Sequence, residues 1–178
     1  MANDFLIVVD MQNDFISGVL GSPGAASIAV KACEKIRAFD GTVIFLQDTH
    51  DENYATTQEG RMLPVPHCIK GTGGWALAPE LEALRVELSA RVFEKPCFGS
   101  LELAEFLQAE DGRTKIDSIE LIGLCTDICV AENSLLLKTF LPETEILVDA
   151  CCCAGTTPEN HKAALAVMKS CQVKTKED

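Results

Sequence analysis

Basic residues are scarce in this chain. Its 178 residues include 15 Lys and Arg against 27 Asp and Glu, which gives a formal net charge of −12. A protein that binds nucleic acid or an anionic membrane needs an excess of positive charge on the binding face. The shortage of positive charge therefore argues against nucleic acid and membrane surfaces as partners.

Long hydrophobic runs are also missing, although hydrophobic residues make up 47% of the chain. No stretch approaches the roughly 20 apolar residues that a transmembrane helix requires. The start of the chain, MANDF, has no basic segment and no cleavage pattern, so we expect no signal peptide. The length suits one domain with a sizeable core, and we expect a single domain over residues 1–178.

Cysteine is the exception to this scarcity, with nine residues at no regular spacing. An odd number of cysteines without an export signal argues against a disulfide framework and indicates reduced thiols in the cytoplasm. Three of them form the run 151–153, just after a predicted strand. Neighbouring cysteines are poorly placed to bridge each other, so we interpret this run as small residues that pack at a strand end.

Apolar runs alternate with segments whose apolar residues recur at helical spacing. We predict strands at 5–9, 42–46, 90–94, 116–124 and 144–148, with 171–175 as a candidate sixth, edge strand. We predict helices at 25–39, 79–88, 100–107, about 126–140 and 158–169. This alternation predicts an α/β fold with three α-β-α layers around a doubly wound, mostly parallel sheet of five to six strands. The turn-rich stretch after residue 47, to about residue 74, is long for a compact domain, which favours a functional loop.

A sharp strand-to-helix turn lies in residues 119–134, IELIGLCTDICVAENS. Thr126 and Asp127 are residue types that cap helices, which would place Cys129 in the first helical turn. Free N–H groups and the helix dipole lower the pKa of a thiol at that position, and a thiolate is a nucleophile. The stretch alone fits a catalytic cysteine and a buried structural cysteine equally well.

Reactive residue types follow the ends of four predicted strands. They are Asp10, Asp48 with His50, Lys95, and the turn that carries Cys129. In open α/β sheets, ligands bind outside the carboxyl ends of the strands. One such residue alone is usually solvated surface, but four sets at one edge of the sheet favour a cysteine-dependent active site.

Three separate patches resemble the family of nicotinamidase/isochorismatase-like cysteine hydrolases. They are residues 8–15 (VVDMQNDF), Lys95, and residues 123–130 (GLCTDICV), and the similarity extends over about residues 4–170. The segments 21–25 and 149–150 also match positions of similar residues in that family. The three patches together are specific, whereas any one of them alone is not.

The resemblance implies a catalytic triad of Cys129, Asp10 and Lys95. Cys129 would attack a carbonyl carbon, Asp10 would take and return its proton, and Lys95 would favour the charged forms of both. The resemblance also implies an oxyanion hole made by the backbone N–H groups of Cys125 and Cys129, and a cis peptide bond between Leu124 and Cys125. It further implies a small-molecule amide substrate and a homo-oligomer, either a dimer or a tetramer.

A metal site is predicted in the long loop, where Asp48, His50 and His67 fit zinc, iron or manganese. In the nicotinamidases of the resembled family, a metal at this place binds the pyridine nitrogen of the substrate. The middle histidine of their commonest pattern is absent here, and Glu59 is the candidate that replaces it. The alternative is that His50 and His67 are ordinary loop histidines.

Three aromatic residues are candidates for holding a flat ring: Phe15, Trp75 and Tyr54. Each of them would serve equally well in the core or at a rim.

From the resemblance, the triad positions and the candidate metal ligands Asp48, His50 and His67, we expect a metal-dependent amidohydrolase. It would convert nicotinamide to nicotinate and ammonia and also accept pyrazinamide. The alternatives are a metal-free relative acting on another amide, carbamoyl or vinyl ether substrate, and a non-catalytic thiol-based binding or redox-sensing protein.

Overall fold

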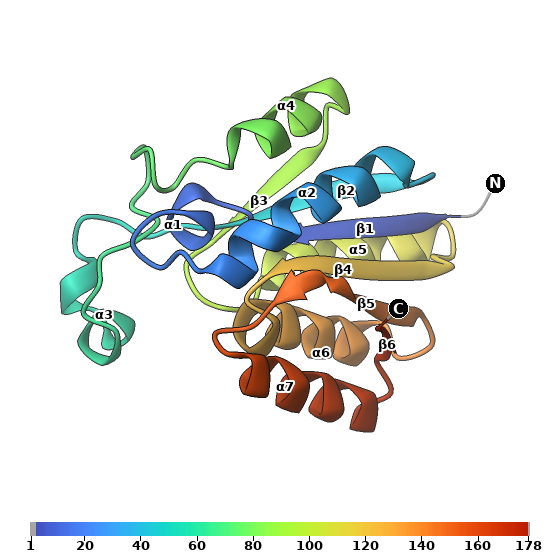
Figure 1. Cartoon of the computed structure of the whole chain (residues 1–178). Coiled ribbons are helices and arrows are strands. Elements are labelled where there is room, and N and C mark those ends of the chain that lie inside the picture. Colours follow the sequence, from blue (N-terminus) through green and yellow to red (C-terminus); the bar gives the residue numbers. More distant parts are fainter. Residues whose placement is uncertain (1–2, 178) are drawn as a thin grey trace.

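Six parallel strands form one sheet in the computed structural model, which describes residues 3–177 (Figure 1). The strand order is β3-β2-β1-β4-β5-β6. The strands are β1 (Asp4–Val9), β2 (Thr42–Asp48), β3 (Arg91–Lys95), β4 (Ser118–Leu124), β5 (Glu145–Ala154) and β6 (Lys174–Lys176). The predicted fold class is confirmed, and the mostly parallel sheet is parallel at every pairing between these strands.

Helices cover both faces of the sheet and make three layers. One face carries α1 (Asn13–Ile16), α2 (Pro23–Ala38) and α4 (Pro79–Glu87), and the other carries α5 (Leu101–Arg113), α6 (Ala131–Phe140) and α7 (Pro158–Ser170). A helical turn, Thr126–Val130, precedes α6, and the long loop contains a 3-10 turn, Tyr54–Thr56, and α3 (Gln58–Met62). Figure 1 shows α3 set apart from the body of the sheet.

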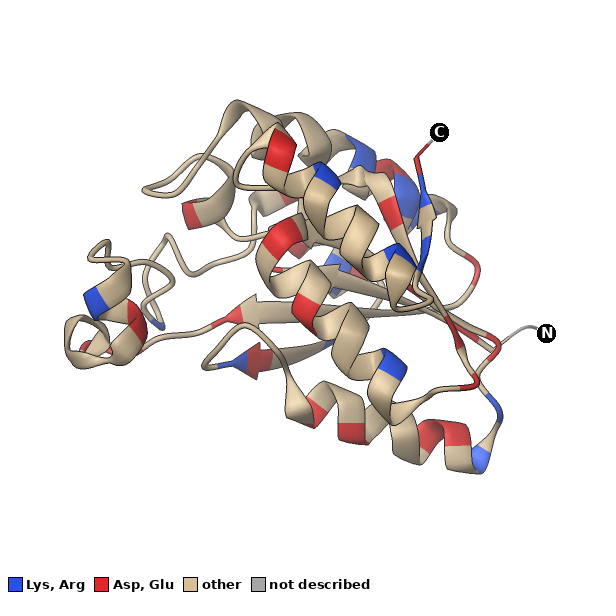
Figure 2. Ribbon diagram, turned by 90° about the horizontal axis from the view of Figure 1, so that it is seen from below, with Lys and Arg blue, Asp and Glu red and all other residues tan. Residues whose placement is uncertain are grey.

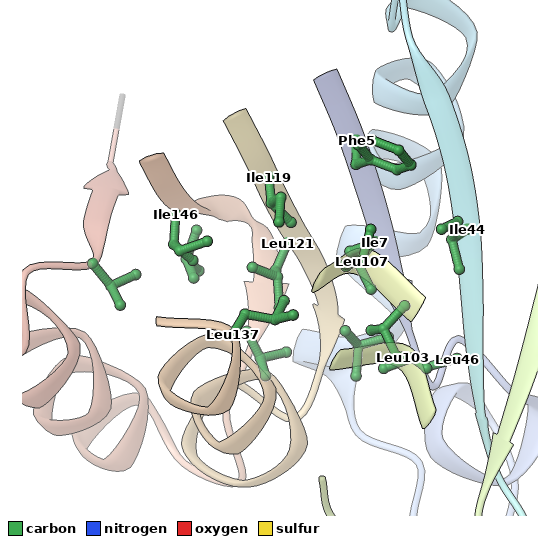
Figure 3. Packing of buried hydrophobic residues seen from close by; sticks show 14 of the residues in the cluster. Phe5, Ile7, Ile44, Leu46, Leu103, Leu107, Ile119, Leu121, Leu137 and Ile146 are labelled. Atoms are coloured by element: carbon green, nitrogen blue, oxygen red, sulfur yellow. The ribbon is translucent and has the colours of Figure 1, made fainter. Parts of the chain in front are cut away.

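The apolar run of β1 explains why the sheet is covered on both sides. Phe5, Ile7 and Val9 face the α5–α7 layer, whereas Leu6 and Val8 face the α2 layer. On the α5–α7 side, neighbouring strands add Ile44, Ile119 and Leu121 to the same hydrophobic cluster (Figure 3). Burial of one such side chain contributes about 1.5–3 kcal/mol to stability. A strand of this kind needs no polar alternation, because both of its faces are dry.

Strand β5 is longer than the sequence predicts. We expected a strand at 144–148 followed by the cysteine run, but β5 continues to Ala154 and contains all three cysteines. After an irregularity in β4, the pairing resumes with Gly123 opposite Cys153 and Leu124 opposite Ala154. Cys152 and Cys153 are buried against opposite faces of the sheet, so the run is part of the strand rather than its end.

Other boundaries also differ from expectation. Helix α5 extends to Arg113 instead of residue 107, β6 begins at Lys174 instead of residue 171, and residues 13–16 form a short helix where none was predicted. Within the part of the chain that the structure describes, no helix is long and apolar enough to cross a membrane. Acidic residues are spread over the helices, strands and loops (Figure 2).

The strand order places a crevice between β1 and β4. The chain adds β2 and β3 on one side of β1, and then β4, β5 and β6 on its other side. Helices that follow β1 and β4 therefore leave toward opposite faces, which opens a ligand-binding crevice at the carboxyl ends of these strands. Asp10 and the cysteine turn follow the carboxyl ends of β1 and β4 and therefore lie at this crevice.

Candidate active site

The end of β1 turns sharply out of the sheet at Asp10. Asp10 has a left-handed backbone with φ 50°, and its N–H donates to the carbonyl of Leu46 at 3.1 Å. A non-glycine residue in this conformation is uncommon and often marks a functional site. The turn leaves the Asp10 side chain fully buried and next to the end of β3.

The end of β4 approaches β1 more closely than a side chain would allow. Gly123 has φ +118°, and a Cβ at this residue would lie 2.1 Å from the carbonyl oxygen of Val9. Only glycine fits this position. The peptide bond between Leu124 and Cys125 is cis, as the resemblance implies.

Thr126 and Asp127 do not cap the following turn, contrary to the sequence-based expectation. The Thr126 hydroxyl lies 2.8 Å from Nδ1 of His161, and the Asp127 carboxylate accepts a 2.8 Å hydrogen bond from the backbone of Thr156. Both side chains thus hold the cysteine turn against the start of α7. Their residue types suit a cap, but the contact with a distant helix is not visible in the local sequence.

Lys95 contacts both other residues of the predicted triad, Asp10 and Cys129. Its Nζ lies 2.7 Å from Oδ2 of Asp10, 3.4 Å from Sγ of Cys129 and 3.2 Å from Oδ1 of Asp48. Lys95 and Asp10 are fully buried, and Cys129 is 6% exposed. The structure therefore brings one ammonium group, two carboxyl groups and one thiol into direct contact away from solvent.

Burial sets the protonation states of this cluster. Burial raises the pKa of Asp10 to about 6, against the opposing charge of Lys95. Burial, assisted by the negative charge of Asp10, also raises the pKa of the Cys129 thiol well above its usual value. Burial alone would lower the pKa of Lys95, but the charges of Asp10 and Cys129 outweigh it and raise that pKa.

These directions correct the expectation that a helix start would lower the thiol pKa. Cys129 is dehydrated and faces a carboxyl group, and both effects favour the neutral thiol. The cysteine therefore rests as a thiol, and its proton must move to a neighbour before the sulfur can attack. Asp10, with a pKa of about 6, is the group suited to accept that proton near neutral pH.

Asp48, His50 and His67 lie together at the ends of β2 and the long loop. Their ligand atoms are all within 4.8 Å of one another. Oδ2 of Asp48 is 3.0 Å from Nε2 of His50 and 3.5 Å from Nε2 of His67, and Oε1 of Glu59 is 3.6 and 3.7 Å from the same nitrogens. The edge of a tetrahedron with metal–ligand bonds of 2.0–2.1 Å is about 3.3 Å. Asp48, His50 and His67 thus form a group that could hold one ion, and Glu59 lies beside both histidines.

Two further observations support a metal at this position. Nδ1 of His67 donates to the carbonyl of Val65 at 2.8 Å, which leaves its Nε2 with a lone pair toward the cluster. Among residues 3–177, Nε2 of His50 is one of three buried side-chain atoms without a hydrogen bond of acceptable geometry. An imidazole nitrogen left unpaired in a dry pocket suits metal ligation.

Asp48 connects the two halves of the site. Its Oδ1 contacts Lys95 and its Oδ2 contacts the histidines. Burial raises the pKa of Asp48, but the adjacent imidazoles of His50 and His67, together with the charge of Lys95, outweigh it, and the net effect lowers that pKa. The carboxylate is therefore ionised and available to an ion and to the lysine at once.

A cavity of about 410 Å³ opens beside Cys129 and the histidine cluster. Cys125, Asp48, Glu59 and His67 contribute to its wall, and most of the remaining wall is apolar. The apolar part includes Phe15, Leu63, Phe98 and Ile128. Phe15 was predicted from the sequence, and its ring lies edge-on to His67 with 5.5 Å between the ring centroids. Leu63 and Ile128 were not predicted, although Ile128 directly precedes Cys129.

Trp75 and Tyr54 do not line this cavity, contrary to expectation. The Trp75 indole donates to the hydroxyl of Thr49 at 2.9 Å. Tyr54 is buried behind the histidines, with its ring centroid 4.7 Å from that of His50, and its hydroxyl donates to the carbonyl of Leu63 at 2.9 Å. Both aromatics contact residues of the loop instead of the cavity. The loop sequence alone does not show which aromatic residues face the cavity.

The fold and site define a doubly wound α/β protein with a cysteine-centred site beside a group that can bind a metal. The model of the isochorismatase domain matches residues 4–177, so the chain belongs to the isochorismatase family.

Known proteins similar to this chain include solved proteins named nicotinamidase or pyrazinamidase and one relative named as inactive. A solved nicotinamidase/pyrazinamidase from Bacillus subtilis is 27% identical, with a TM-score of 0.86 over 98% of this chain and 100% of that one. A pyrazinamidase from Pyrococcus horikoshii, solved in complex with zinc, is 26% identical, with a TM-score of 0.77 over 99% of both chains. An Arabidopsis thaliana relative that is 30% identical, over 97% of this chain and 91% of its own length, is named a probable inactive nicotinamidase.

Proposed function

We propose that this protein is an amidohydrolase that converts nicotinamide to nicotinate and ammonia, and that it also hydrolyses pyrazinamide. The observation that carries the proposal is the contact of Lys95 with both Asp10 and Cys129, at the wall of a cavity that also exposes Asp48 and His67. A nucleophile, a base and a group for ring binding are thereby present in one site. The relatives named nicotinamidase or pyrazinamidase support this assignment.

The reaction begins with transfer of the Cys129 proton to Asp10. The sulfur then attacks the amide carbonyl, and the backbone N–H groups of Cys125 and Cys129 stabilise the tetrahedral oxyanion. Lys95 offsets the negative charge that the cluster carries during this step. Asp10 returns the proton to the departing amine, and ammonia leaves.

The second half of the reaction removes the acyl group from the sulfur. Asp10, now a carboxylate again, accepts a proton from a water molecule that attacks the thioester carbonyl. The carbon–sulfur bond breaks, the Asp10 proton returns to Cys129, and the carboxylic acid product leaves. No redox step is needed, and the water oxygen ends in the product.

Asp48, His50 and His67, with Glu59 as the fourth ligand, would hold zinc, iron or manganese. When bound, the ion would supply a Lewis acid that ligates the pyridine nitrogen and so orients the ring. Phe15, whose ring lies edge-on to His67, and Leu63 and Phe98, which line the same cavity, would offer apolar contacts to the ring. Cys129 lines the same cavity, where it would meet the carboxamide.

The test is ammonia release from nicotinamide by the purified protein. We expect release that disappears after chelation and returns with added zinc, iron or manganese. Cys129→Ala should abolish turnover and retain the fold, because the side chain contacts the reacting carbon. Cys33→Ala is the control, since it removes another buried thiol that does not line this cavity.

Each alternative function predicts a different result. Release that persists after complete metal removal would contradict the metal-dependent reaction and favour a metal-free relative. A protein that binds nicotinamide with equal affinity before and after Cys129→Ala, and releases no ammonia with any metal, would be a non-catalytic binder. Because one relative is named a probable inactive nicotinamidase, the binding measurement on Cys129→Ala has to accompany the activity assay.

A further inference from the structure

Gln12 is a fully buried polar residue that the reaction above does not use. Its side chain forms three hydrogen bonds. Oε1 accepts from the backbone N–H of Asp48 at 2.8 Å, and Nε2 donates to the backbone carbonyls of Asp48 at 2.9 Å and of Trp75 at 2.8 Å. One carboxamide therefore satisfies both backbone polar groups of Asp48.

This arrangement fills a gap in the sheet. Strands β1 and β2 pair as far as Val9 opposite Leu46, and then Asp10 turns out of the sheet. Asp48 lies two residues beyond that last pair, where β1 no longer supplies a partner. On its other side, Asp48 still pairs with Lys95 of β3. The Gln12 side chain takes the place of the missing strand, because a buried backbone group without a partner is strongly unfavourable.

The fixed backbone matters because Asp48 has to serve two neighbours at once. Oδ1 lies 3.2 Å from Lys95 and Oδ2 lies 3.0 Å from His50, so each oxygen has its own partner. A rotation of the Asp48 backbone would move both oxygens together. Metal and catalytic sites tolerate displacements of only about 0.5 Å.

We propose that Gln12 is the positioning residue of the metal centre, which holds Asp48 in the one orientation that serves both the histidines and Lys95. It does so through the Asp48 backbone and touches neither the reacting atoms nor the ligand atoms. This inference rests on the metal site of the proposed function. It adds that the ligand set depends on a residue from the turn after β1, far from the ligands in sequence.

Gln47 provides a matched control within the same network. It is buried, as Gln12 is, and its Nε2 also donates to the Trp75 carbonyl, at 3.1 Å. It makes no side-chain hydrogen bond to Asp48 among the described residues. Loss of Gln47 therefore reports on anchoring of the loop at Trp75, whereas loss of Gln12 reports on anchoring of Asp48 as well.

The experiment compares Gln12→Met with Gln47→Met. Both changes keep the length of the side chain and remove its hydrogen bonds. Zinc affinity is measured by competition with a chromogenic chelator, and cobalt(II) absorption reports the coordination geometry. We expect Gln12→Met to weaken zinc binding about 10–100-fold, as loss of an outer-shell partner does, and to alter the cobalt spectrum. Gln47→Met should match the wild type in both measurements.

Gln12→Asn is the second variant, in case the apolar side chain prevents folding. It keeps a carboxamide but is one methylene too short to bond both groups of Asp48, and it should show the same loss of zinc affinity. Equal zinc affinity of a folded Gln12 variant and the wild type would overturn the positioning role and leave the proposed function intact. A wild-type protein that binds no zinc, iron or manganese would instead overturn the metal site itself.

Discussion

Ionisation of Asp10 should destabilise the folded protein, and Asp10→Asn should therefore make it more stable while abolishing turnover. The carboxyl group is fully buried, and burial is the main reason why its pKa rises from 3.8 to about 6. Asn has the same shape as a protonated Asp and stays neutral at every pH. The variant thus keeps the packing and removes the buried charge that the base requires.

The magnitude follows from the shift in pKa. The folded protein binds the Asp10 proton more tightly than the unfolded chain does, so this group stabilises the fold at low pH relative to high pH. That stability is lost as the pH rises from 3.8 through about 6. At 1.36 kcal/mol per pKa unit, the wild type loses about 1.5 kcal/mol by pH 5.0 and about 3 kcal/mol by pH 7.5. The difference in the free energy of unfolding between Asp10→Asn and the wild type should therefore grow by about 1.5 kcal/mol from pH 5.0 to pH 7.5.

The assay is urea-induced unfolding of the metal-free proteins at pH 5.0 and pH 7.5, followed by the fluorescence of the single tryptophan, Trp75. Both values lie above the sequence pI of about 4.6, which limits precipitation. Asp51→Asn is the control, because Asp51 is exposed and belongs to the neighbouring loop. A stability difference between Asp10→Asn and the wild type that does not change with pH would refute the reasoning. The pKa of Asp10 would then be the same in the folded and the unfolded protein.

Three further predictions concern the same cluster. The kcat/KM for nicotinamide should fall as the pH drops through about 6, because Asp10 must be ionised to accept the thiol proton; an acid limb near pH 4 in the pH–rate profile would contradict this. Lys95→Met should lower the free energy of unfolding by about 3–5 kcal/mol in urea titrations, because it leaves two buried carboxyl groups without their counter-charge. Glu59→Gln should weaken zinc binding at least about 10-fold, measured by chelator competition, whereas the same change at the exposed Glu52 should leave it unaltered.

The sequence was sufficient to predict which residues meet at the sheet edge. Asp10, Lys95 and the Cys129 turn each follow an apolar strand, and parallel strands present their carboxyl ends on one side. The strand pairings place these three ends next to one another, with β1 between β2 and β4. Topology rules and strand patterns therefore carry this part of the prediction without any knowledge of side-chain conformation.

Properties that depend on burial were not predictable in this way. A cysteine at a helix start normally has a lowered pKa, but Cys129 has lost its solvent and faces Asp10, and these two effects dominate. The loop aromatics illustrate the same limit. Trp75 was as good a candidate as Phe15 by residue type, but its indole is turned toward Thr49 and the cavity wall is formed by Leu63 instead.

The first patch of the resemblance, residues 8–15, owes its compactness to one backbone turn. Because Asp10 adopts a left-handed conformation, its own side chain reaches Lys95 and the chain leaves the sheet at once. Two residues later, Gln12 returns its carboxamide to the end of β2, and the short helix α1 then places Phe15 against His67. The proposed base, the proposed clamp on a metal ligand and a wall of the cavity thus come from six consecutive residues. None of these tasks follows from helix or strand propensity. The pattern of residue types therefore located the site, whereas local propensity predicted no helix or strand between residues 10 and 24.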